Sequence, residues 1–283
     1  MQKDSLSLIE RGRRFPHPEH FMLLVERYGV TGYSLGDFFD QKTSHLLELK
    51  NRILSAMCCK ELGLLPELLF RFREAMEEKK PISDSGNIFS QQFFQYANGW
   101  FDYASGGDPQ LFLTSCITCL RLTQPHFGDT FNATDAFLNQ NELMILNSIA
   151  CLYALLSQNR QALILFEQMI IKQKRMIASH PIHYKNLICL YHNAALLELE
   201  VDLLLSEEHI RHAKHLASQY GGVWTGCRVW RSELQIIRHL RPSHDLTDDL
   251  WGLKAVYTHF RPKSMVEIDF DSFMEKQEFL ELF

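Results

Sequence analysis

Apolar residues recur every three or four positions along most of the chain, which is the period of an amphipathic α-helix. These runs predict helices over residues 46–59, 65–78, 89–104, 109–121, 139–157, 160–178, 182–199, 206–219, 223–238 and 246–260. Residues 82–88 are predicted to be a loop, and residues 265–283 a short extended piece followed by a terminal helix. No segment alternates apolar and polar residues as a strand does, so the pattern predicts an all-α fold.

The predicted helices follow one another in pairs at a spacing of about 40 residues, which is typical of a helical-repeat array. Residues 146–169 resemble a tetratricopeptide repeat. Two small residues, Ala150 and Ala162, would let the paired helices approach closely, and Tyr153 and Phe166 would fill the space beside them.

The next pair follows the same pattern less closely. Ala194 and Ala213 occupy the two small positions, but the gap between them is seven residues longer than in the best unit. This difference predicts a longer first helix or a longer loop.

Composition narrows the range of functions. The net charge is −5, which argues against a generally basic nucleic-acid-binding surface. Residues 242–283 hold all of the excess negative charge, so a basic patch elsewhere in the chain is still compatible with the composition. No apolar run is long enough for a membrane helix and no signal peptide is visible, so we expect a cytoplasmic protein without membrane contact. The seven cysteines are scattered and odd in number, which favours reduced, buried thiols.

Residues 5–30 carry the most specific motif of the chain. Ser7, Ile9, Glu10, Gly12, Arg14 and Pro16 are followed by Leu23, Leu24 and the Tyr28-Gly29-Val30 corner. This spacing is similar to the Xre/Cro-type helix-turn-helix family, at the point where its recognition helix leads into the fourth helix. The resemblance covers under a tenth of the chain.

The resemblance implies a DNA-reading role for the start of the chain. It places Gln2, Lys3 and Ser5 near base edges, and Arg11, Arg13 and Arg14 near phosphates. Domains of this family begin with two further helices, about 25 residues, which have no counterpart in this sequence. Without that cover, apolar residues such as Ile9 and Phe21 would be partly exposed, and DNA binding would depend on another surface covering them.

A small helix-turn-helix followed by a repeat array resembles the peptide-pheromone-responsive regulators of the Rgg/PlcR-like group. That resemblance implies a homodimer whose repeat domain binds a short peptide on its concave side. Asparagines on the first helices hold the peptide backbone in that group, which here suggests Asn147 and Asn193, with Tyr153 and Tyr191 as neighbours.

We therefore expect a partial helix-turn-helix over residues 1–40, connecting helices over 41–81, and a tetratricopeptide-like sensor and dimerisation domain over 82–283. The function expected from this layout is a bacterial transcription regulator controlled by a peptide or protein ligand. The alternative is a repeat-based adaptor that no longer binds DNA. We expect no cofactor and no enzyme activity, because no phosphate-binding loop, nucleophile elbow or His-Glu-x-x-His motif is present.

Several residues have a structural reading that competes with a functional one. A hydrogen bond to a neighbouring helix is favoured over ligand contact for Asn147 and for Asn193. Core packing is favoured over redox chemistry for the Cys116-x-x-Cys119 motif, and Cys58-Cys59 is expected to be half buried.

The same holds for a set of histidines and a set of tryptophans. A solvated helix face is favoured over a metal site for His209, His212 and His215, which recur every three residues. Packing in the last repeats is favoured over base stacking for Trp224, Trp230 and Trp251.

Overall fold

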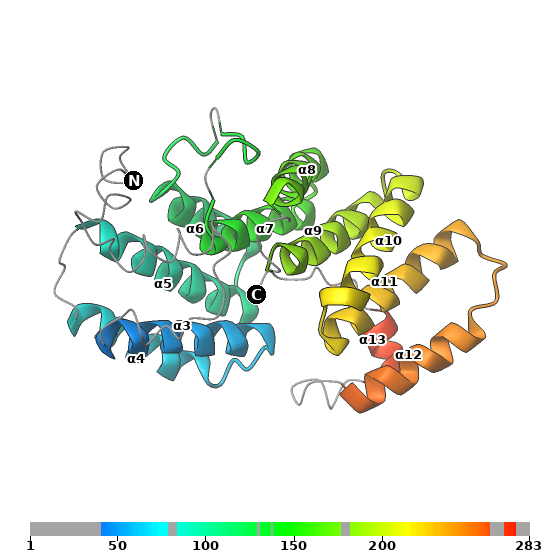
Figure 1. Cartoon of the computed structure of the whole chain (residues 1–283), viewed down its shortest axis with the longest axis horizontal. Helices are drawn as coiled ribbons and strands as arrows, with labels where there is room; N and C mark the ends of the chain where they lie inside the picture. The colour runs from blue at the N-terminus through cyan, green and yellow to red at the C-terminus, as the bar shows by residue number, and fades with distance from the viewer. Residues whose placement is uncertain are drawn as a thin grey trace. The chain divides into compact units, whose positions relative to one another are not determined.

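The computed structural model describes residues 41–78, 84–128, 131–136, 138–176, 182–260 and 269–275. In these ranges every regular element is an α-helix and no strand occurs, which confirms the all-α prediction (Figure 1). The chain divides into two compact units, residues 1–129 and 130–283. None of the described helices is long and apolar enough to cross a membrane.

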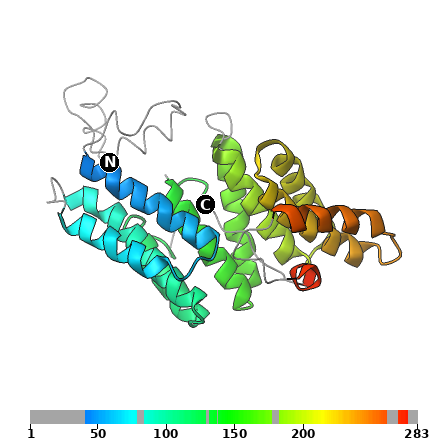
Figure 2. The same ribbon diagram turned by 90° about the horizontal axis from the view of Figure 1, so that it is seen from below.

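The described part of the first unit contains four helices: α3 (Gln41–Cys58), α4 (Leu65–Glu78), α5 (Asp84–Ala104) and α6 (Pro109–Arg121). Each packs against the next, as the side-by-side ribbons of Figure 2 show. Their core combines aliphatic and aromatic side chains, and the Phe72 ring on α4 meets the Phe93 ring on α5 edge to face, with centroids 5.4 Å apart. Buried aromatic pairs of this kind add stability beyond the burial of their area.

The second unit contains α7 (Gln140–Leu155), α8 (Asn159–Met176), α9 (Ile182–Glu198), α10 (Leu203–Tyr220), α11 (Val223–Leu240), α12 (Thr247–Phe260) and α13 (Phe270–Glu275). Successive helices from α7 to α12 pack in order, and α7 and α11 also contact α9 directly. The odd-numbered helices α7, α9 and α11 therefore form one layer, here called the inner layer, and α8, α10 and α12 cover it.

The helix pair predicted over residues 146–169 is observed as α7 and α8, and its predicted packing positions are buried or half buried. Ala150, Ala162, Phe166 and Met169 are fully buried, and Tyr153 is half buried. Burial of apolar side chains on the facing sides of two helices is what holds the pair together.

The longer Ala194–Ala213 gap does not arise from a longer first helix or a longer loop, so that prediction is wrong. The distance from the first small residue to the start of the following helix is the same in both pairs, nine residues from Ala150 to Asn159 and nine from Ala194 to Leu203. The second helix instead starts earlier, ten residues before Ala213 compared with three before Ala162. The seven extra residues form two additional turns at the start of α10, so the alanine keeps its face.

Two predicted boundaries are corrected. Residues 82–88 are not all loop, because α5 begins at Asp84. Asp, Ser and Asn are common in the first turn of a helix, so polarity alone does not separate a loop from a helix start. Helix α10 begins at Leu203 instead of residue 206, where the Asp202 carboxylate accepts hydrogen bonds from the backbone N–H groups of Leu204 and Leu205, both at 3.1 Å.

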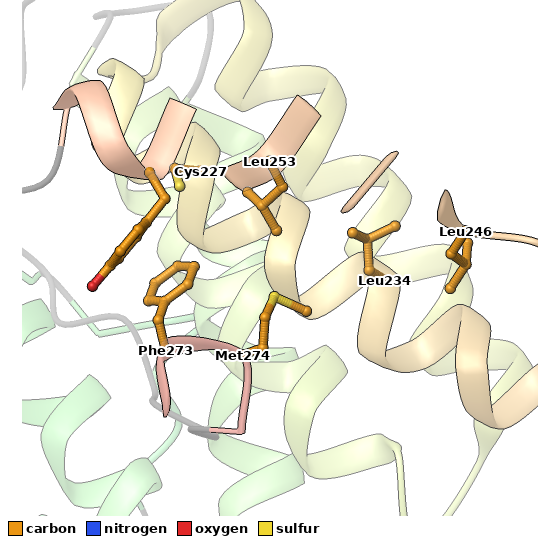
Figure 3. Close-up of a cluster of buried hydrophobic side chains, with 7 residues drawn as sticks. Cys227, Leu234, Leu246, Leu253, Phe273 and Met274 are labelled. Carbon is orange, nitrogen blue, oxygen red and sulfur yellow. The ribbon is translucent and has the colours of Figure 1, made fainter. Parts of the chain in front are cut away.

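The last three helices are held together by an apolar cluster (Figure 3). Its buried members are Cys227, Leu234, Leu246, Leu253, Tyr257, Phe273 and Met274. Phe273 on the short helix α13 packs on Tyr257 of α12, with ring centroids 4.4 Å apart. Arg231 on α11 is also fully buried, and it donates a hydrogen bond to the Phe273 carbonyl at 3.1 Å.

Candidate functional site

Polar side chains that are buried or half buried gather on the inner layer of the second unit. Most of their hydrogen bonds join neighbouring helices, and one contact joins His192 to Asn193 within α9. The members are Gln140 and Asn147 on α7, Asn186, His192 and Asn193 on α9, and Ser232 on α11. We call this set the polar strip. A buried polar group is costly unless it is hydrogen-bonded, so its bonds explain how the strip persists.

Two amide pairs join α7 to α9 in the same register. Gln140 and Asn186 exchange two hydrogen bonds, at 3.0 and 3.1 Å. One end of this pair is half exposed, at Gln140, while Asn186 is buried. The Asn193 amide donates to the Asn147 carbonyl oxygen at 2.8 Å, and both residues are almost fully buried. The two residues of each pair are 46 positions apart in the sequence, so both pairs share one register. Along each helix the pairs are seven residues apart, which is about two turns.

A third contact continues the strip from α9 to α11. The His192 ring nitrogen Nε2 lies 2.9 Å from the Ser232 hydroxyl, and Nδ1 lies 3.3 Å from the Asn193 side-chain oxygen. Burial, and after it the positive charges of Arg228 and Arg231, lowers the pKa of His192 to about 3. The imidazole is therefore neutral at physiological pH, and the strip between Asn147 and Ser232 consists of neutral hydrogen-bonding groups.

The strip reaches solvent at its edges. Asn193 also contacts the Cys151 sulfur at 3.6 Å, and Cys151 is half exposed. On α9, Cys189 lies between Asn186 and Asn193 on the same helix face and is half exposed as well. A side-chain amide carries an N–H donor and a carbonyl acceptor, as a peptide group does. An amide that pairs with another amide can therefore also pair with a peptide backbone.

The four residues predicted to hold a peptide do not form one cluster. Asn147 and Asn193 are brought together, and the hydrogen bond between neighbouring helices that the alternative reading predicted is present. Tyr153 lies half buried at the end of α7. Tyr191 is buried against α10, where its ring centroid lies 5.1 Å from that of His212 and 5.3 Å from that of His209. Their role in binding a peptide remains a prediction.

Sequence reasoning missed Gln140, Asn186, His192 and Ser232. A signal for the first two was present: Gln140 and Asn147 are seven residues apart, and so are Asn186 and Asn193. This spacing places both amides of each helix on one face. Ser232 had no such signal, because its partner depends on how α11 packs against α9.

The histidines predicted to form a solvated face are not equivalent. His209 Nδ1 lies 2.7 Å from the buried carboxylate of Glu198, and only 14% of its side chain is exposed. His212 is about half exposed and pairs loosely with Glu208 at 3.7 Å. His215 is exposed. The prediction is therefore wrong for His209, which links α10 to α9. The described residues contain no cluster of His, Cys, Asp or Glu that could hold a metal ion.

The cysteine motif on α6 is packed in the core, as predicted. Cys116 and Cys119 are both buried. Burial, and next the neighbouring Cys119, raises the pKa of the Cys116 thiol well above its usual value, and burial raises the pKa of Cys119 to about 11. Both thiols are thus protonated at neutral pH. Cys58 is exposed and Cys59 is half buried, close to the expectation.

The tryptophan prediction holds for two of three residues. Trp224 and Trp230 pack against the apolar cluster of α11 to α13. Trp251 does not, since 68% of it is exposed on α12. Hydrophobicity reports the average tendency of a residue to be buried and not its position on a given helix.

The DNA-contacting residues proposed from the resemblance, Gln2, Lys3, Ser5, Arg11, Arg13 and Arg14, lie outside the described residues. Compared with known proteins, the chain matches no family model, no curated protein and no solved structure.

Proposed function

We propose that the second unit binds a short peptide in an extended conformation along the polar strip, and that the protein is a cytoplasmic, homodimeric transcription regulator controlled by this peptide. The observation that carries the peptide-binding part is the pair of amide contacts that cross from α7 to α9 in one register. The regulator part rests on the helix-turn-helix resemblance of residues 5–30.

The chemistry of the strip suits a peptide backbone. An extended peptide presents alternating N–H and C=O groups, and a side-chain amide can pair with one of each. The strip offers amides on two helices and a hydroxyl on a third, without a carboxylate among them. Neutral amide groups favour a backbone over a charged metabolite.

Ligand binding would require the amide pairs to exchange partners. The Asn193–Asn147 bond would open, and each amide would bind the peptide instead. Such an exchange is nearly balanced, because a single hydrogen bond contributes only about 0.5–1.5 kcal/mol net. The exchange would separate α7 from α9, change the curvature of the array and so alter the spacing of two DNA-reading heads in a dimer.

A synthetic library of octapeptides tests the binding step. Wild-type protein and the double variant Asn147→Leu/Asn193→Leu are each incubated with the library, and retained peptides are identified by mass spectrometry. The double variant removes both partners of the Asn193–Asn147 bond together, and His192 keeps its contact with Ser232. We expect peptides that are retained by the wild type and lost with the variant. Equal retention by both proteins would remove these residues from the site.

The second candidate function is an adaptor that binds a partner without binding DNA. It is favoured by the helical-repeat pattern of residues 146–169, because repeat arrays present extended surfaces that bind partners. A gel-shift assay with the gene's own promoter separates the two candidates. A shift that weakens as salt increases supports the regulator, since phosphate contacts release counterions. A promoter that stays unshifted at low salt supports the adaptor.

A further inference from the structure

A groove of about 610 Å³ runs between α5 and α6 in the first unit, independently of the polar strip. Its volume lies within the range of about 300–1,000 Å³ that is usual for ligand sites. Its lining residues are Phe94, Gln95, Asn98, Gly99, Asp102, Tyr103, Gly107, Asp108, Leu111, Phe112, Thr114, Ser115 and Thr118. All of them lie in the described part of the chain.

Close approach of the two helices shapes the floor of the groove. Gly99 on α5 lies against α6, where an added Cβ would come within 2.8 Å of the Ser115 hydroxyl oxygen. The Tyr103 and Phe112 rings stack across the two helices, with centroids 5.2 Å apart and planes 15° apart. The groove thus has a flat aromatic wall.

The polar side chains that line the groove are largely turned back onto their own helices. The hydroxyls of Thr114 and Thr118 donate to the backbone carbonyls of Gln110 and Thr114, each at 2.9 Å. The Asn98 amide donates to the Phe94 carbonyl at 2.7 Å. The surface that remains for a partner is therefore mainly apolar. Leu111 extends from it, with 70% of the residue exposed.

Charge at the groove has one sign. Among its lining residues, only Asp102 and Asp108 are charged, and none is basic. Asp108 caps α6 by accepting a hydrogen bond from the Gln110 N–H at 2.8 Å. Asp102 lies in the last turn of α5, where the carbonyl end of the helix dipole is negative and a carboxylate is unfavourable. A cation at this end would be attracted by both carboxylates and by the helix terminus.

From the apolar wall and the negative end, we propose that the α5–α6 groove is a docking site for an amphipathic peptide segment of a partner protein, in which Lys or Arg flanks apolar side chains. The apolar side chains lie against Phe94, Phe112 and Leu111, and the cation lies near Asp102. This site does not depend on the peptide site proposed for the second unit.

Fluorescence anisotropy with a labelled model peptide tests the proposal. The probe is an amphipathic Leu/Lys peptide of about twelve residues, near the minimum length for a helix in water, and the matched control replaces every Lys by Glu. We expect saturable binding of the Leu/Lys peptide and none of the Leu/Glu peptide. Asp102→Asn should weaken binding about fivefold, and Leu111→Lys about tenfold or more.

Two control variants separate the groove from general attraction to a negatively charged protein. Asp248→Asn removes one exposed acid on α12, and Leu204→Lys replaces a leucine on α10 that is 74% exposed. Both should leave the affinity unchanged within twofold. Binding that is equally weakened by the control variants, unaffected by Asp102→Asn and Leu111→Lys, or absent in the wild type would overturn the proposal.

Discussion

Asn193 on α9 donates a hydrogen bond of 2.8 Å to Asn147 on α7, and both residues are almost completely buried. Removing one partner leaves the other with an unsatisfied polar group, which costs about 1–3 kcal/mol. We expect Asn147→Leu and Asn193→Leu each to lower the free energy of unfolding by that amount. The double variant should lose less than the sum, because no orphaned amide remains. Urea unfolding of the four proteins measures this coupling, and strictly additive losses would contradict a direct bond.

His192 should make stability depend on pH. Burial and the two nearby arginines lower its pKa from 6.5 to about 3 in the folded protein. Between these values the unfolded chain binds a proton that the folded protein does not, so stability falls as the pH decreases from 6.5 and is unaffected by this group above 6.5. The slope from one proton is at most about 1.4 kcal/mol per pH unit. In urea titrations from pH 7.5 to 5, His192→Gln should flatten the curve relative to the wild type. Parallel curves would show that His192 is not the titrating group.

Phe273 should be a key residue for docking α13. Its ring is fully buried, and its centroid lies 4.4 Å from that of Tyr257 and 5.7 Å from that of Trp224. Truncation to alanine in a packed core costs about 3–5 kcal/mol. Phe260→Ala is the matched control, because Phe260 is 48% exposed and should change stability by about 0.5 kcal/mol or less. Thermal unfolding of both variants distinguishes them, and equal small shifts would mean that α13 is not packed as described.

Thiol labelling should separate the cysteines by location. Cys58 is exposed, whereas Cys116 and Cys119 are buried with raised pKa values. Because the thiolate is the reactive form, iodoacetamide at pH 8 should modify Cys58 in the native protein well before either residue of the motif. Peptide mapping by mass spectrometry gives the order. Early modification of Cys119 in folded protein would argue against its burial.

The sequence predicted helix bounds well where capping or helix-breaking residues mark the ends. The predicted ranges 65–78 and 109–121 are the observed bounds of α4 and α6, and Pro109 follows an Asp108 cap. The start of α5 was missed because Ser85, Gly86 and Asn87 have low helix propensity, although a first turn tolerates them. The buried alanines of the repeat were predicted because their role depends only on spacing within one helix pair.

The candidate site was harder to predict, because it depends on contacts between helices. Asn147 and Asn193 were both identified, yet their pairing depends on the 46-residue register between α7 and α9, which no local pattern specifies. The same holds for His209, whose regular spacing with His212 suggested solvent exposure. Its actual partner, Glu198, lies at the end of the preceding helix.

The central claim is that the amide pairs of α7 and α9 bind a peptide backbone. The most direct measurement is isothermal titration of the best-retained library peptide into three proteins: the wild type, Asn147→Leu/Asn193→Leu, and Ser218→Ala as a surface control. We predict that the double variant binds at least about tenfold more weakly, a loss of about 1.4 kcal/mol, while the control equals the wild type. Equal affinity for all three proteins, or a library from which the wild type retains no peptide, would contradict the claim.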